Sequence, residues 1–462
     1  MELTLVIIFV LGYLAIAFEH PLKINKTAPA LLIGVLTWTA WVLFTGTSEE
    51  NAHGIGHELS HHLGSISEIL FFLLGAMTIV EIVDAHQGFK VITNRIKTKD
   101  SRKLLWIISI ITFFLSAVLD NLTTSIVMVS LLRRLIHDKD QRKFFACMVI
   151  IAANAGGAWS PIGDVTTTML WIDGQITSGN IIKTLFIPSL VCLIAPLIFL
   201  SFKMKGDIKR AEYDYEEAEH QEEVKGSVLM FFLGVGLLLF VPVFKTVTHL
   251  PPYVGMLFGL GVIWVVSELL HVNKTEEEKK PYTALHALTR IDTSSILFFL
   301  GILLAIASLE ATHVLEHLAK WMDNSIGDPN IIVTSIGLLS SVVDNVPLVA
   351  ASMGMYPLAS GAVNPEAFQW ALANPSAVTE GYFMFEGVKY YLTDAKMWEF
   401  MAYAAGTGGS CLIIGSAAGV AVMGMEKIDF IWYLKKITML ALIGYFAGIF
   451  CYLAIYPIFA VH

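Results

Sequence analysis

The chain has 462 residues, of which 55% are hydrophobic and only 15% charged, with a formal net charge of −9. Long apolar runs such as 182–202 and 437–459 are typical of a polytopic membrane protein and leave a soluble enzyme as a poor alternative. We find no nucleotide-binding motif or convincing metal-ligand set, and we expect no cofactor and no nucleic-acid partner.

Three crossings are predicted at the start of the chain, at about 3–18, 27–45 and 67–85. Between the second and third lies a histidine-rich stretch, 53–62, which we interpret as a solvated loop that faces outward. Its histidines titrate near neutral pH, but their spacing on a flexible loop is a weak indication of a metal site.

The next apolar segment, 104–133, carries Asp120 and Asn121 at its centre and basic clusters at both ends. Each arm is too short to cross a ~30 Å hydrocarbon core comfortably at 1.5 Å per residue. A single crossing would also place one basic cluster on the wrong side of the membrane. A re-entrant hairpin with Asp120 at its tip avoids both difficulties, and the alternative is one long tilted helix.

A broken crossing is predicted at 144–172, because residues 154–168 read Asn-Ala-Gly-Gly-Ala-Trp-Ser-Pro-Ile-Gly-Asp-Val-Thr-Thr-Thr. Glycine costs a helix roughly 1 kcal/mol and proline about 3, so the helix should break here. Unwound backbone within a membrane is tolerated where it lines a cavity, and free carbonyls beside Asp, Asn, Ser and Thr oxygens suit a hard cation. A fifth crossing, 182–202, then leads to a charged cytoplasmic linker, 205–226.

The second half repeats the first. Residues 340–345, Ser-Ser-Val-Val-Asp-Asn, match 116–121, Ser-Ala-Val-Leu-Asp-Asn, and paired glycines recur in the same order further on. We therefore expect an all-α protein made of two repeats, 1–204 and 227–462. The second contains crossings at 228–245, 252–270, 294–311 and 437–459, a hairpin at 331–358, an aromatic insertion at 361–396 and a broken helix at 398–424.

Five crossings per half invert the second repeat relative to the first and put both termini outside the cytoplasm. This topology leaves 25 of the 30 Lys and Arg residues in the cytoplasm, as the positive-inside rule requires. Only five lysines lie outside, namely Lys183, Lys245, Lys320, Lys389 and Lys396. Inverted repeats that meet at mid-membrane are the architecture of secondary transporters.

Three carboxylates, those of Asp120, Asp164 and Asp344, are predicted near the membrane centre. Burial favours the protonated acid and a bound cation favours the anion, so one carboxylate can alternate between H⁺ and a metal ion. The core segments contain no Lys or Arg to pair with these acids. A purely structural alternative is that Asp344 caps a half-helix or pairs with a buried base. Neutral oxygens for the cation are available from Asn121, Asn154, Asn345, Thr123, Thr124, Thr166, Ser160 and Ser410, although Ser and Thr also serve in helix packing.

The hairpin tips, the 154–168 segment and the inverted halves together resemble the NhaD-type sodium/proton antiporters of bacteria, over essentially the whole chain. The resemblance implies a multi-pass Na⁺ and Li⁺/H⁺ exchanger of the bacterial inner membrane that forms a homodimer. It places Na⁺ at Asp120, Asn121, Asp164 and Asp344. The full set of cation- and proton-binding residues that it implies is Asp120, Asn121, Asn154, Asp164, Thr166, Ser340, Asp344 and Asn345, with Ser410 and Ser416 as candidates in the second broken helix.

Two rival functions stay open. A sodium-coupled anion symporter would have to bind a dianion beside these acids, and two like charges some 5 Å apart repel by roughly 3 kcal/mol at an effective dielectric constant near 20. A cation channel would need a row of ion sites without obligatory closing, whereas paired hairpins favour alternating access.

Overall fold

The computed structural model describes residues 1–17, 19–93, 96, 98–204, 206–208, 224 and 226–459. Within them, eight helices are long and apolar enough to cross a membrane, and several shorter apolar helices accompany them. The predicted all-α polytopic fold is therefore confirmed. Most of the predicted linker, 205–226, lies outside the described residues.

The first half of the chain forms α1 (Glu2–Ala17), α2 (Glu19–Leu22), α3 (Thr27–Thr45), α4 (Glu49–Ala85), α5 (Lys90–Thr93), α6 (Ser101–Leu119), α7 (Asn121–Leu135), α8 (Lys139–Ala158), α9 (Val165–Ile172) and α10 (Ser178–Lys203). The crossing predicted at 27–45 coincides with α3. The loop predicted at 53–62 is wrong, because α4 continues through it. Ser48 caps α4 by accepting a hydrogen bond from the backbone N–H of Asn51 at 3.3 Å, and the stretch contains no proline to end the helix.

The second half begins with α12 (Ser227–Thr248), α13 (Pro252–Leu270), α14 (Glu276–Lys279), η1 (Lys280–Tyr282), α15 (Ala284–Arg290), α16 (Thr293–Ala311) and α17 (Val314–Ser325). The second hairpin and the insertion follow as α18 (Pro329–Leu339), α19 (Asn345–Met355), β1 (Leu358–Ala359), α20 (Pro365–Ala373), η2 (Pro375–Ala377), β2 (Tyr382–Phe385) and β3 (Val388–Leu392). The chain closes with α21 (Lys396–Gly408), α22 (Ala417–Glu426), α23 (Phe430–Lys436) and α24 (Thr438–Phe459).

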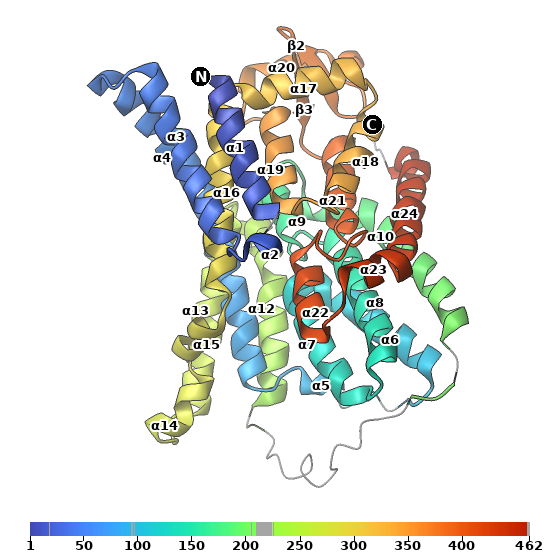
Figure 1. Ribbon diagram of the computed structural model, residues 1–462. Coiled ribbons are helices and arrows are strands. Elements are labelled where there is room, and N and C mark those ends of the chain that lie inside the picture. The colour runs from blue at the N-terminus through green and yellow to red at the C-terminus, as the bar shows by residue number, and fades with distance from the viewer. Residues whose placement is uncertain are drawn as a thin grey trace.

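The aromatic insertion contains a small sheet that the sequence analysis did not foresee. Its strand order is β1-β3-β2, with β1 parallel and β2 antiparallel to β3, and Leu358 pairs with Tyr391. Alternate aromatic side chains of the hairpin, among them Phe383, pack with α20 in a second, smaller apolar core. The sheet and α17 together cover one end of the helical body (Figure 1).

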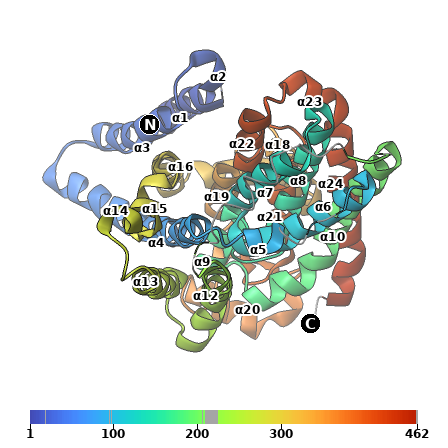
Figure 2. The same cartoon turned by 90° about the horizontal axis from the view of Figure 1, so that it is seen from below.

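The long helices form two groups that lie side by side (Figures 1 and 2). We call α1, α3, α4, α12, α13 and α16 the six-helix group, because they pack mainly on one another. The hairpin group consists of α6 to α10, α18, α19 and α21 to α24. Helices α9 and α19 stand at the boundary, where α9 touches α4 and α19 touches α16.

The two arms of the first hairpin, α6 and α7, have their outer ends at the same end of the molecule. Gln141, near the start of α8, donates a side-chain hydrogen bond to Ser101 at the start of α6, at 2.9 Å. Its neighbour Arg142 donates to the carbonyl of Ile136, just beyond the end of α7, also at 2.9 Å. The chain reverses at Asp120, so this residue is the tip of the hairpin.

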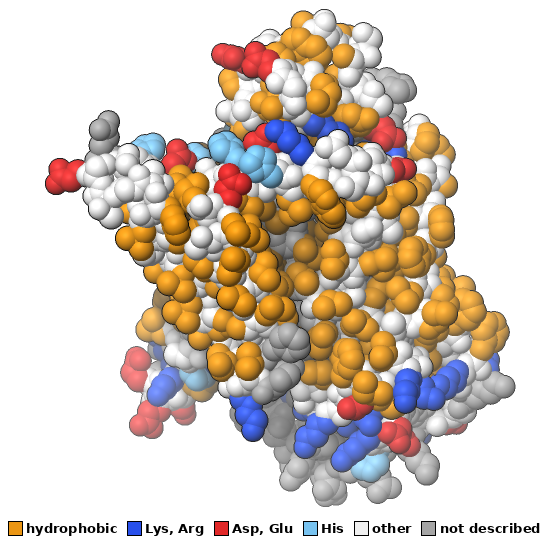
Figure 3. Space-filling model, turned by 45° about the horizontal axis from the view of Figure 1, so that its top comes forward, with side chains coloured by type: hydrophobic (Ala, Val, Ile, Leu, Met, Phe, Trp, Pro, Cys, Tyr) orange, Lys and Arg blue, Asp and Glu red, His pale blue; other side chains and the backbone are white. Residues whose placement is uncertain are grey.

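On the face drawn in Figure 3, an apolar belt crosses the middle of the molecule, and Lys and Arg side chains gather at its lower rim. Exposed side chains such as Leu32, Phe232 and Phe450 contribute to the belt. A soluble protein would hide most of this surface, whereas the hydrocarbon of a bilayer covers it without cost.

Candidate functional site

Four helices begin at the centre of the molecule, and each starts at a residue that the sequence analysis singled out. The residues are Asp120, Asp164, Asp344 and Ser416, which precede α7, α9, α19 and α22. Each side chain accepts a hydrogen bond from a backbone N–H in the first turn of its own helix, at 2.9 to 3.3 Å. These caps satisfy amides that would otherwise lack partners inside the membrane.

Asp164 is the centre of the site and is only 2% exposed. Asn121, at the tip of the first hairpin, donates Nδ2–H to its Oδ2 at 2.6 Å. Asn345, at the tip of the second hairpin, approaches both carboxylate oxygens with its Nδ2 at 3.4 and 3.5 Å. Thr166 donates both its backbone N–H and its hydroxyl to Oδ1, at 2.9 and 2.8 Å. Both hairpins therefore meet at one carboxylate.

Asn154 extends this network to the second broken helix. Its Oδ1 accepts a hydrogen bond from Asn121 at 3.1 Å. Its Nδ2 donates to the hydroxyls of Ser410 and Ser416, at 2.9 and 3.1 Å. Both serines are buried. Ser410 and Ser416, the candidates that the resemblance implies in the second broken helix, thus lie in the same network as Asp164.

Asp120 is close to this network but is engaged with its own helix. Its carboxylate accepts from the backbone N–H of Thr123 at 2.9 Å and from the Thr123 hydroxyl at 2.7 Å. Its backbone has φ 76° and ψ 158°, a conformation that is essentially restricted to glycine. A residue held there stores about 1–3 kcal/mol of strain, so the tip of the first hairpin is a strained turn.

Asp344 both caps α19 and pairs with a base, as the structural alternative for this acid predicts, although the base lies outside the core segments. Lys26, immediately before α3, places its Nζ 3.2 Å from Asp344 Oδ2, and the two side chains are 25% and 15% exposed. The ammonium also lies over the ring of Phe298, 4.3 Å from its centroid. Lys26 belongs to a different segment from the acid, which is why inspection of the core segments alone missed it.

Two other hydroxyls among the predicted site residues donate hydrogen bonds to backbone carbonyls near the interrupted helices. Ser160 donates to the carbonyl of Ala117 at 2.6 Å, and Ser340 donates to that of Ala405 at 2.8 Å. Both satisfy carbonyls near the interrupted helices, which is a structural role. Thr124 is different, because it is buried and its Oγ1 has no hydrogen-bond partner within the described part of the chain.

Matching contacts recur in the two halves. Ser116 donates to Ala153 at 2.7 Å, as Ser340 does to Ala405. A Cβ added to Gly163 would lie 2.8 Å from the carbonyl oxygen of Ser116, and one added to Gly415 would lie 2.6 Å from that of Ser340. Only glycine permits these approaches. At the matched capping positions of α9 and α22, the first half has Asp164 and the second half has Ser416, so only the first half carries an acid there.

The side chains that contact Asp164 are neutral, so the chemistry around it is that of one carboxylate among amides and a hydroxyl. No group of three or more His, Cys, Asp and Glu side chains is placed as a metal site among the described residues. Each asparagine can present either N–H to a bare carboxylate or, after its amide turns over, a carbonyl oxygen to a cation. Such a set suits a monovalent hard cation better than a tightly chelated divalent one.

Comparison with known proteins gives the family. Residues 13–374 match the CitMHS family, described as citrate transporter. Sodium/proton antiporter 1 of Arabidopsis thaliana is 45% identical over 98% of this chain and 73% of its own length, and sodium/proton antiporter 2 of the same plant is 44% identical over 97% and 99%. The Na(+)/H(+) antiporter NhaD of Vibrio parahaemolyticus is 28% identical over 91% and 98%. This chain is therefore a member of the CitMHS family and a relative of plant and NhaD sodium/proton antiporters.

Proposed function

We propose that this protein exchanges Na⁺ for H⁺ across a membrane, with Asp164 as the group that binds the two ions in turn. The observation that carries the proposal is the position of Asp164, where amides from both hairpins meet at a carboxylate with no Lys or Arg partner among the described residues. The names of the relatives, at 44–45% and 28% identity, support the same function.

The exchange follows from competition at one carboxylate. Deprotonated Asp164 attracts Na⁺, and the amide oxygens of Asn121, Asn154 and Asn345 complete a neutral shell when their side chains turn. Protonated Asp164 has no charge to offer and releases the ion. Alternation between the two membrane faces would then come from movement of the hairpin group against the six-helix group, as in other transporters built from repeats.

The family description also suggests an anion as substrate, so a citrate or dicarboxylate symporter is the second candidate. The centre disfavours it. An anion at this place would stand beside the Asp164 carboxylate, at a cost of roughly 3 kcal/mol for two charges some 5 Å apart at an effective dielectric constant near 20. The nearby ammonium of Lys26 is already paired with Asp344.

We extend the proposal to the orientation of the protein, its cellular location and its assembly. The basic rim of Figure 3 is assigned to the cytoplasm by the positive-inside rule, which puts α17 and the small sheet outside. The inverted relation of the two repeats is part of the same assignment. On the resemblance to NhaD proteins, we further propose Li⁺ as a second substrate, a homodimer as the assembly and the bacterial inner membrane as the location.

The test is a proton-dye assay in proteoliposomes with an imposed pH gradient. Added Na⁺ should collapse the gradient, while citrate and succinate should leave it unchanged. Asp164→Asn should abolish the response, because an amide neither titrates nor carries charge. Asp140→Asn is a matched control, since Asp140 is an acid on α8 whose side chain is 88% exposed. A Na⁺ response retained in full by Asp164→Asn would refute the assignment.

A further inference from the structure

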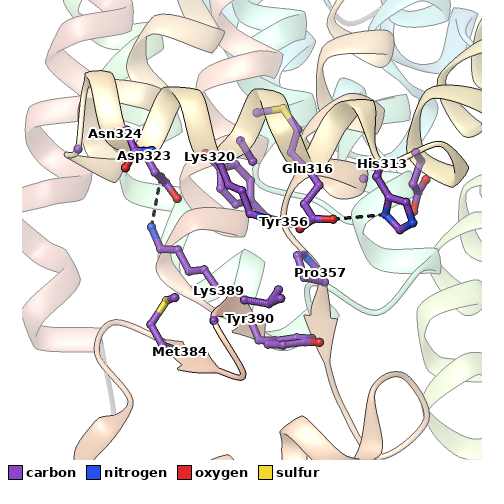
Figure 4. Close-up of a pocket in the computed structure, with 17 residues that line it drawn as sticks. His313, Glu316, Lys320, Asp323, Asn324, Tyr356, Pro357, Met384, Lys389 and Tyr390 are labelled. Atoms are coloured by element: carbon purple, nitrogen blue, oxygen red, sulfur yellow. Dashed lines mark hydrogen bonds and ion pairs between the residues drawn. The ribbon is translucent and has the colours of Figure 1, made fainter. Parts of the chain in front are cut away.

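Two adjoining cavities occupy the end of the molecule that carries α17 and the small sheet. The outer cavity, of about 620 Å³, lies between α17 and the β2–β3 hairpin (Figure 4). The inner cavity, of about 350 Å³, is lined by residues of α4, α9, α16 and α19. Glu310 and Pro357 line both, so the two spaces share a wall at these residues.

The inner cavity extends toward the central site along two helices. Met169 of α9 and Ala350 of α19 line it. Met169 lies five residues after Asp164, and Ala350 lies five residues after Asn345, at the central ends of the two helices. Five residues correspond to about 7.5 Å of helix. The cavity therefore ends about one and a half helical turns from Asp164.

Most charges of the outer cavity are already paired. Glu316 contacts His313 at 3.3 Å and Lys320 at 2.5 Å. Asp323 contacts Lys389 at 3.4 Å, and the contacts of Glu316 with His313 and of Asp323 with Lys389 are drawn in Figure 4. Glu310 is the exception, because its carboxylate makes no ion pair or hydrogen bond with the described residues. The unpaired acid thus stands where the two cavities meet.

Glu310 also marks the boundary between the two helix groups. It is the penultimate residue of α16, and it faces Gly354 of α19 so closely that a Cβ on that glycine would lie 3.2 Å from the Glu310 carboxyl carbon. Its side chain is exposed, although helices surround it. Glu310 therefore stands both at the junction of the two cavities and at the contact of α16 with α19.

Two further side chains with oxygen atoms, Asp173 and Gln175, line the inner cavity. Asp173, which caps the end of α9, lines the cavity and forms no ion pair with the described residues. Gln175 is only 6% exposed, and its Oε1 has no hydrogen-bond partner within the described part of the chain. Lys245 lies over the ring of Trp171 and donates to its carbonyl, so one positive charge is fixed nearby and offsets part of the acidity.

We propose that the two cavities form a recruiting site for a hydrated monovalent cation, in which Glu310 attracts the ion and Asp173 and Gln175 receive it before Asp164. This inference rests on the proposed Na⁺/H⁺ exchange. The inner cavity has room for several water molecules at about 30 Å³ each, so the ion keeps part of its hydration shell. Negatively charged side chains in a cleft focus the electric field, which raises the local concentration of cations without tight binding.

Transport kinetics provide the first test. In proteoliposomes, Glu310→Gln and Asp173→Asn should raise the apparent KM for Na⁺ about threefold or more when the ion is added on the α17 side, with the maximal rate retained. Addition from the opposite side should give the wild-type KM. Glu316→Gln is the matched control, because Glu316 lines the outer cavity but is already paired. An unchanged KM in Glu310→Gln, or an equal rise from both sides, would overturn the inference.

A second test does not depend on transport. Ser65 is exposed and lines the inner cavity, so Ser65→Cys introduces a reactive thiol there with little change in size. The ratio of its reaction rates with a cationic and a neutral methanethiosulfonate should fall about threefold when Glu310→Gln is added, and stay constant with Glu316→Gln. A constant ratio in both would refute the recruiting site. If wild-type protein shows no Na⁺ response but the ratio falls, the proposed function fails and the cation-attracting cavity stands.

Discussion

Lys26 joins the six-helix group to the tip of the second hairpin through an ion pair with Asp344, 318 residues away in the chain. The ammonium therefore places a positive charge directly beside this carboxylate. Asp120, at the equivalent tip, has a hydroxyl and an amide as partners instead. The two acids of the duplicated motif are therefore in different electrostatic surroundings.

Removal of the ammonium should strengthen Na⁺ binding. Lys26→Met leaves the Asp344 carboxylate without its counter-charge, so we expect the apparent KM for Na⁺ to fall by up to about fivefold, since a partly exposed pair contributes about 1 kcal/mol or less. Lys26→Arg keeps the charge and should behave as wild type. Sodium titrations in proteoliposomes measure both, and a higher KM in Lys26→Met would show that the pair assists binding instead.

Asp120→Gly should separate stability from transport. Glycine adopts the Asp120 backbone conformation freely, which relieves about 1–3 kcal/mol of strain, and it loses only a few tenths of a kcal/mol as a helix cap. We expect an unfolding temperature in detergent at or above that of wild type, together with weaker Na⁺-dependent proton movement, because a carboxylate beside Asn121 of the Asp164 site is lost. Retained exchange would remove Asp120 from the mechanism, and a large drop in unfolding temperature would contradict the strain.

Close packing at the helix breaks predicts a strong effect of a single methyl group. A Cβ at Gly156 would overlap the carbonyl of Phe113, and one at Gly408 would overlap that of Gly337. Either glycine changed to alanine should destabilise the protein by about 1–3 kcal/mol, because the obstructing atoms are backbone. Gly236→Ala is the control, since nothing lies within 4 Å of its added Cβ, and it should stabilise α12 by up to about 1 kcal/mol. Thermal unfolding of purified protein compares the three.

Loss of the Ser416 hydroxyl should weaken the centre without removing its charge. Ser416→Ala takes away the cap of α22 and one hydrogen bond to Asn154, worth together about 1–2 kcal/mol. We expect the apparent KM for Na⁺ to rise several-fold while exchange persists. Ser60→Ala is a suitable comparison, since the Ser60 hydroxyl bonds only within α4 at an exposed position. Identical KM values for the two variants would place Ser416 outside the ion site.

A buried histidine pair predicts a dependence of stability on pH. His86 and His271 follow the ends of α4 and α13, and their Nε2 atoms lie 3.1 Å apart, with Tyr282 stacked on His271. Burial lowers the pKa of His86 below the ordinary histidine value, and the charge of Lys274 acts in the same direction against the hydrogen bond to Ile82. The neutral pair therefore contributes fully above about pH 6.5, and its contribution is lost as pH falls through the lowered pKa.

Unfolding temperatures measured between pH 7.5 and 5.5 would check this. The charged neighbours Glu81, Asp84 and Arg290 are joined in ion pairs in the same region and are present in every variant. Wild type should lose stability toward pH 5.5, and His86→Gln should lose less. Parallel curves for the two proteins would exclude the pair as the source.

Much of the fold could be predicted because the membrane imposes it. Apolar length located α3 and α13, and the cost of glycine and proline located the break before Asp164. The extension of α4 and the small sheet were missed, since both lie in polar or aromatic stretches where the bilayer gives no guidance. Residues 53–62 contain glycine and serine, which are common in loops, yet the stretch has no proline that would end a helix.

Residue type was enough to propose members of the site but not their arrangement. Residue type identified Asp120, Asp164 and Asp344 as costly buried acids, but only packing decides that Asn121 and Asn345 reach Asp164. Pairing of Asp344 with a base was one of the alternatives, but the identity of that base, Lys26, depends on how the two helix groups dock. A single lysine at the start of a membrane crossing indicates which side of the membrane that end faces. The sequence does not show that the same lysine also pairs with Asp344.

The replacement of an aspartate by Ser416 at the matched capping position has an energetic consequence for the driving force. One proton and one Na⁺ carry the same charge, so a swap confined to Asp164 leaves the moving part of the protein equally charged in both directions. That cycle would be electroneutral and indifferent to membrane voltage, which otherwise acts with about 2.3 kcal/mol per charge and 100 mV. Coupling to voltage would require a further titrating carboxylate, and Asp120 directly precedes Asn121, whose amide donates to Asp164.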